Sequence, residues 1–181
     1  MPYFQPDFTR LCYRDLTASF LQEQGVRVLL LDIDNTLAPY EQLDPDDHIR
    51  AWLQSLADAG IKAALLSNNH GDRMERFNRE LGLPCKSGAC KPLPFRGKKL
   101  MKRLGGTKKT TLLMGDQIFT DILCAHHMGI RGILVPPIKD KTDAGTRFKR
   151  YLERGILRRY YKKHPDEPDV RLGSTIAKEF V

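Results

Sequence analysis

The sequence predicts an α/β fold in which a doubly wound parallel sheet is covered by helices on both faces, the Rossmann-like arrangement. Short apolar runs alternate with longer amphipathic segments along residues 26–138, a pattern typical of βαβ units. The chain of 181 residues is long enough for one full core, and its 41% hydrophobic and 29% charged residues are typical of a globular protein. No apolar run approaches the ~20 residues of a membrane span.

The first predicted elements lead into the first strand of the sheet and the helix after it. Residues 1–25 are expected to form a lead-in ending in a short helix, with Thr17 as its N-cap and Gly25 at its end. Residues 26–33 are apolar except for Arg27 and Asp32, which predicts a buried strand. A helix over residues 43–60 follows, and we expect Asp44 as its N-cap with Pro45 in the first helical position.

The later segments continue the alternation, so the parallel sheet should grow by right-handed crossovers. Periodicity and turn residues predict, in chain order, a strand over 61–67, a helix over 71–82, a short strand within 83–87, a helix within 92–105, a strand over 110–116, a helix over 118–129 and a last strand over 131–137. Residues 26–138 then form the core domain, 139–163 a basic helical segment, and 164–181 a tail that is at least partly loose.

The basic character of the chain is concentrated in residues 139–163. This segment holds ten Lys or Arg against three acids, and the whole chain carries a net charge of +8. Four of its apolar residues fall on one predicted helical stripe: Phe148, Tyr151, Leu152 and Ile156. The stripe is expected either to pack on the core or to bind an anionic membrane surface. Nucleic acid is a third candidate partner, although no nucleic-acid-binding motif supports it.

The four cysteines indicate a cellular compartment. They contain no Cys-x-x-Cys pair, which favours free thiols in a reducing cytoplasm. The N-terminus has no basic start followed by an apolar stretch, so we expect no secretory signal. A cytoplasmic location is therefore predicted, with peripheral membrane attachment if the basic segment binds lipid.

Acidic and polar side chains follow several of the predicted strands. The carboxyl ends of parallel strands meet at one edge of a sheet, so these residues should converge there. They are Asp32, Asp34 and Thr36 after the first strand, Ser67 and Asn68 after the second, Lys91 after the third, and Asp116 and Asp121 after the fourth. Clustered carboxylates repel one another, and Mg²⁺ both cancels that repulsion and binds phosphate oxygens. The pattern indicates phosphate-ester chemistry.

Asp32 and Asp34 can take two different catalytic roles. One carboxylate can attack phosphorus and form an acyl phosphate, while the other protonates the leaving oxygen and then activates water. The motifs DIDNTL and GDQIFTD, together with Ser67 and Lys91, resemble those of the haloacid dehalogenase superfamily. The resemblance implies that Asp32 is the nucleophile and Asp34 the acid/base. It favours phosphate-ester hydrolysis over dehalogenation, because superfamily dehalogenases lack the second acid.

The same resemblance implies the remaining site roles. Thr36, Ser67, Asn68 and Lys91 would bind the substrate phosphate, and Lys91 would also assist catalysis. Mg²⁺ would be held by Asp32, by the main-chain oxygen of Asp34 and by Asp116, while Asp121 would bind it through water or steady Lys91.

The spacing of these motifs leaves no room for a cap domain. Thirty residues separate Thr36 from Ser67 and twenty-three separate Ser67 from Lys91, whereas an independent domain needs at least ~50 residues. The chain resembles a capless branch that includes bacterial YqeG-type proteins and mitochondrial phosphatidylglycerophosphate phosphatases. Phosphatidylglycerophosphate is therefore the leading expected substrate. The alternatives are soluble sugar or nucleotide phosphates, or a binding protein for RNA, ribosome or membrane built on this scaffold. The sequence leaves the oligomeric state open.

Overall fold

The computed structural model describes residues 2–69, 72–139 and 144–172. Six strands form one sheet in which every adjacent pair is parallel, in the order β1-β6-β5-β2-β3-β4. The strands are β1 (Phe8–Thr9), β2 (Val28–Leu31), β3 (Lys62–Leu66), β4 (Cys85–Lys86), β5 (Thr111–Gly115) and β6 (Arg131–Leu134). The predicted parallel α/β sheet is confirmed.

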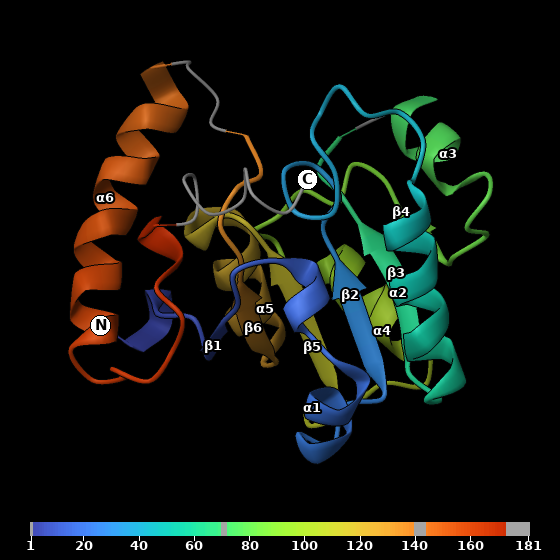
Figure 1. Ribbon diagram of the computed structural model, residues 1–181, viewed down its shortest axis with the longest axis horizontal. Helices are drawn as coiled ribbons and strands as arrows, with labels where there is room; N and C mark the ends of the chain where they lie inside the picture. The colour runs from blue at the N-terminus through green and yellow to red at the C-terminus, as the bar shows by residue number, and fades with distance from the viewer. Residues whose placement is uncertain (1, 70–71, 140–143, 173–181) are drawn as a thin grey trace.

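Helices connect these strands and cover both faces of the sheet (Figure 1). The α-helices are α1 (Ala18–Glu23), α2 (Asp47–Asp58), α3 (Asp72–Asn78), α4 (Phe95–Arg103), α5 (Leu123–Met128) and α6 (Ala144–Tyr161). Short helical turns are η1 (Pro2–Phe4), η2 (Tyr13–Asp15), the π-helical η3 (Ile118–Ile122) and η4 (Val170–Leu172). The apolar runs and amphipathic segments therefore form the elements they predicted, with ends shifted by a few residues.

Alternate residues of β2 enter two different cores. Leu29 and Leu31 pack with residues of α1, α2 and α3 on one face of the sheet. Val28 and Leu30 pack with residues of α4 and α5 on the other. Because successive side chains of a strand point to opposite faces, a strand buried on both sides must be apolar throughout. This explains the unbroken hydrophobic sequence of β2.

Two local expectations differ from the structure. The helix of residues 43–60 begins at Asp47, and its N-cap is Asp46, whose carboxylate accepts a hydrogen bond from Ile49 N at 2.8 Å. Asp44, the predicted cap, pairs instead with Arg76 at 2.5 Å. Its carboxylate therefore links the segment before α2 to helix α3. The lead-in also contains a strand that the sequence did not indicate: β1 pairs with β6 through two residues, too few for a period-two pattern.

The chain between the motif residues forms only core elements. The described residues between Thr36 and Ser67 form α2 and β3, and those between Ser67 and Lys91 form α3 and β4. The expected absence of a cap domain is therefore confirmed for this part of the fold. Among the described residues, no helix has the length and hydropathy needed to cross a membrane.

Helix α6 lies against the β1–β6 side of the sheet (Figure 1). Its packed face only partly matches the predicted stripe, because Ile156 packs against the core but the buried residues are Glu153, Leu157 and Tyr160. Tyr151 is 71% exposed and Leu152 is 42% exposed. The side chain of Phe148 lies outside the described residues. The helix thus both packs on the core and presents an aromatic, basic face to solvent.

Candidate active site

The register of the sheet brings two aspartates to the same level. Leu31 of β2 pairs with Met114 of β5, and the next residue, Asp32, donates its backbone N–H to Met114 O at 3.0 Å. Asp116 follows β5 by one residue. Two adjacent parallel strands therefore end side by side, each followed by an acid.

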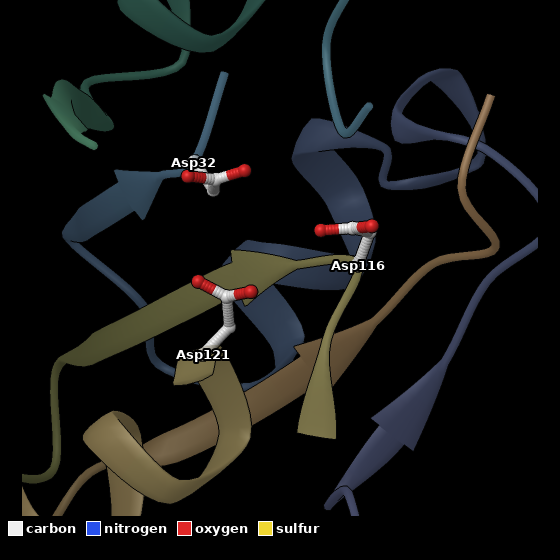
Figure 2. A group of neighbouring side chains, drawn as sticks. All are labelled: Asp32, Asp116 and Asp121. Atoms are coloured by element: carbon white, nitrogen blue, oxygen red, sulfur yellow. The ribbon is translucent and has the colours of Figure 1, made fainter. Parts of the chain in front are cut away.

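Asp32, Asp116 and Asp121 form a buried carboxylate cluster. Each offers an oxygen, and these oxygens lie within 4.8 Å of one another. Figure 2 shows the three carboxylates arriving from the end of β2, the segment after β5 and the turn that follows it. Their exposed fractions are only 6%, 1% and 1%. Three like charges at this separation, out of water, require positive charge close by.

Lys91 supplies part of that positive charge. Its Nζ donates to Asp32 Oδ1 and to Asp121 Oδ1, both at 2.6 Å. Burial by itself would lower the pKa of Lys91, but the two carboxylates outweigh it and hold the pKa above the ordinary value. Burial raises the pKa of Asp32 to about 6, although Lys91 opposes the rise and Asp121 adds to it. The ammonium thus binds two acids of the cluster at once.

Asp121 owes its position to a π-helical turn and to a glycine. Its Oδ2 accepts from Gln117 N at 3.1 Å and from Thr120 Oγ1 at 3.0 Å. A Cβ added at Gly115 would lie 2.2 Å from Asp121 Cγ. The glycine that precedes Asp116 is therefore what lets the second acid of GDQIFTD approach the strand.

Gly115→Ala is expected to displace the Asp121 carboxylate and to lower kcat/KM for a phosphate monoester by about 10- to 100-fold, since small misplacements of reactive groups are costly. Steady-state kinetics measure the effect. Gly155→Ala is the matched control, because a methyl group there meets no atom within 4 Å. Equal activity of Gly115→Ala and the unmodified protein would contradict this assignment.

Asp34 lies apart from the carboxylate cluster. Its Oδ2 accepts from Asn69 Nδ2 at 2.6 Å, and its Oδ1 accepts from Arg73 Nε at 2.6 Å. Ser67 Oγ is a third donor at 3.3 Å. Arg73 is itself fixed by the main-chain oxygens of Pro39 and Gln42. The side chain of Asp34 is thus not among the three close carboxylates, and its main partner, Arg73, was not predicted.

Three predicted substrate-binding residues already have structural partners. The Thr36 hydroxyl donates to Asp32 Oδ2 at 3.0 Å, so both oxygens of Asp32 are oriented. Asn68 Nδ2 donates to Lys91 O, and its Oδ1 accepts from Lys91 N at 2.6 Å. The buried Ser67 accepts from Asn69 N at 3.1 Å. The Asn68 amide therefore fixes the main chain that presents Lys91.

An open cavity of about 270 Å³ unites these groups. It is lined by Asp32, Asp34, Asn35, Ser67, Asn68, Asn69, Lys91, Gln117, Thr120, Asp121 and Lys149. Gln117 and Thr120 lie within the GDQIFTD motif but were not singled out. Lys149 comes from α6 and carries no local sequence signal, because only the packing of that helix brings it to the cavity.

The carboxylate cluster fits a hard divalent cation. The donors are oxygens, which Mg²⁺ prefers, and the three lie within 4.8 Å of one another, so a bound cation would offset their mutual repulsion. Lys91 neutralises one charge of the cluster. The donor set of Asp32, Asp116 and Asp121 is therefore suited to a metal ion.

A parallel sheet that collects acids and a buried lysine at its carboxyl edge is an arrangement in which α/β enzymes place a metal-assisted active site. The chain belongs to the haloacid dehalogenase-like hydrolase family, whose family model matches residues 9–129. The membership suggested by the four motifs is thereby confirmed.

Two relatives agree with this assignment, and one solved structure shares the fold. The chain is 31% identical to "Probable phosphatase YqeG" of Bacillus subtilis, over 86% of this chain and 90% of that protein. It is 26% identical to "Phosphatidylglycerophosphate phosphatase 1, chloroplastic/mitochondrial" of Arabidopsis thaliana, over 87% of this chain and 48% of that protein. An uncharacterized protein from Listeria monocytogenes serotype 4b shares the fold with a TM-score of 0.51 and 16% identity, covering 65% of this chain and 85% of that chain.

Proposed function

We propose that this chain is a Mg²⁺-dependent phosphomonoester hydrolase that works through an aspartyl phosphate on Asp32. The observation that carries the proposal is the buried cluster of Asp32, Asp116 and Asp121 at the carboxyl edge of the sheet, in which Lys91 bridges Asp32 and Asp121. Mg²⁺ would be held by these three aspartates, with the main-chain oxygen of Asp34. When bound, it would neutralise phosphate charge.

The chain's own residues would perform the two displacements. Asp32 attacks phosphorus, the ester P–O bond breaks, and the aspartyl phosphate forms. Asp34, which lines the same cavity, enters this step protonated and gives that proton to the departing alkoxide. Asp34 then takes a proton from water, the water oxygen attacks phosphorus, and the bond to Asp32 breaks to release phosphate. The Lys91 ammonium offsets negative charge at Asp32 during both displacements.

The proposed substrate is phosphatidylglycerophosphate, and two observations support it. One relative carries that substrate in its name. The other is the cavity of about 270 Å³ at the carboxylates, which would take a headgroup presented at a lipid surface. The exposed Tyr151 and Leu152 of α6 lie in the basic segment and favour attachment to anionic membranes. Vesicle flotation tests this attachment, and failure to float with anionic vesicles would reject it.

A metal-dependence assay tests the proposed reaction. Release of phosphate from an aryl phosphate, and from phosphatidylglycerophosphate in mixed micelles, is expected to stop with a chelator and to return with excess Mg²⁺. The physical reason is that the three carboxylates repel both one another and the substrate until a cation is bound. Turnover that persists after exhaustive chelation would contradict the proposed metal dependence.

A further inference from the structure

Lys149 differs from the other cation that lines the catalytic cavity. Lys91 is buried, and its Nζ is held by Asp32 and Asp121 at 2.6 Å each. Lys149 also lines the cavity, yet it is exposed and comes from α6. A cation at the rim whose charge is not spent on the carboxylate cluster is available to an anionic ligand.

The position of Lys149 is set by a buried contact one helical turn away. Glu153, four residues further along α6, is 4% exposed, and its Oε1 accepts from Ile118 N at 2.8 Å. Residues four apart lie on the same face of a helix. Ile118 opens the η3 turn that also carries Asp121. The same turn therefore holds both a cluster acid and the helix that presents Lys149.

Apolar packing reinforces this link. Leu157 of α6 is buried in a cluster with Ile118 and Ile122 of η3 and Leu134 of β6. Helix α6 is therefore docked beside the cavity through a charged contact and an apolar one. No inserted cap lies between the motif residues that the structure describes, and α6 contributes Lys149 to the lining of the cavity.

We propose that Lys149 is a specificity-determining residue which binds a second anionic group of the substrate, beyond the phosphate that is hydrolysed. The preferred substrate class is then a phosphomonoester that carries a further phosphodiester or carboxylate, rather than a simple monophosphate. This inference rests on the proposed phosphatase function and adds a selection rule to it.

The test compares two substrates in one assay. Para-nitrophenyl phosphate has one anionic group, whereas dihexanoyl phosphatidylglycerophosphate, used below its micelle concentration, has a phosphomonoester and a phosphodiester. Lys149→Met is expected to raise KM for the lipid about 10-fold, the loss of one charge-assisted contact, while KM for the aryl phosphate changes less than about 2-fold. Lys149→Arg should retain the KM of the lipid within about 3-fold.

Two further measurements separate specificity from general effects. Lys102→Met removes an equal charge from an exposed site on α4 outside the cavity and should leave both KM values unchanged. In the Asp32→Asn protein, whose turnover is expected to be at least about 10³-fold slower, adding Lys149→Met should weaken binding of the dihexanoyl lipid by the same factor.

Parallel changes of KM for the two substrates, no change for the lipid, or an equal effect of Lys102→Met would overturn the inference while the phosphatase function stands. If the unmodified protein hydrolyses neither substrate with Mg²⁺, the proposed function itself fails, and the inference fails with it.

Discussion

Asp32→Asn is expected to lower kcat for phosphate-ester hydrolysis by at least about 10³-fold, because the amide has the shape of the carboxylate but cannot displace an ester oxygen from phosphorus. Both oxygens of Asp32 are oriented in the native site, one by Lys91 and one by the Thr36 hydroxyl. A nucleophile held in this way lowers the entropic part of the barrier. The substitution therefore removes the nucleophilic charge and keeps the size of the side chain.

The control for this experiment is Asp58→Asn, which neutralises an exposed acid at the end of α2. It should leave kcat and KM unchanged. Circular dichroism and a thermal melt check that Asp32→Asn is folded. A folded Asp32→Asn protein with native turnover would remove the proposed nucleophile from the mechanism.

Lys91→Met is expected to destabilise the metal-free protein by about 3–5 kcal/mol, because it leaves two buried carboxylates without their cation. Asp32 and Asp121 both contact the Lys91 ammonium at 2.6 Å, and all three residues are buried. Urea unfolding with a chelator present measures the loss. The pKa of Lys91 is already raised by these acids, so the ammonium remains charged throughout the neutral pH range.

Excess Mg²⁺ should restore part of the stability lost in Lys91→Met, since a cation bound to the cluster offsets the same repulsion. The control is Lys86→Met in β4, an exposed position where such a change costs no more than about 0.5 kcal/mol. Unfolding curves of Lys91→Met that match those of Lys86→Met would show that the buried cluster does not depend on this lysine.

The position of the carboxylate cluster could be predicted because its residues come shortly after the ends of strands. A parallel register places residues after β2 and β5 at one edge, and Asp32 and Asp116 are the acids at those positions. Lys91 and Asp121 were also expected there, and the structure brings both to Asp32. A residue one or a few positions past a strand has little freedom, so the sequence constrains it well.

The surroundings of Asp34 could not be anticipated in the same way. Arg73 reaches Asp34 from α3 because two loop carbonyls, those of Pro39 and Gln42, orient its guanidinium. Such a contact depends on how a loop closes over a helix start. No periodic signal in the sequence encodes that closure, and an arginine near a helix terminus is most often a solvated charge.

The orientation of α6 was also beyond the sequence pattern. Apolar residues occur around most of its circumference, so periodicity does not separate the predicted stripe, which contains Tyr151 and Leu152, from the buried face, which contains Leu157 and Tyr160. The hydrogen bond that Glu153 accepts from Ile118 N selects the packed face. A buried glutamate in a basic segment is therefore the feature that brings Lys149 to the cavity.

Trapping of the covalent intermediate tests the central claim most directly. The protein would be mixed with substrate and Mg²⁺, quenched in acid within milliseconds, reduced with borohydride and digested for mass spectrometry. An acyl phosphate on Asp32 is reduced to homoserine, so the account predicts homoserine at position 32 and at no other aspartate. Efficient turnover with no modification at position 32, or with phosphate trapped on Ser67, would contradict it.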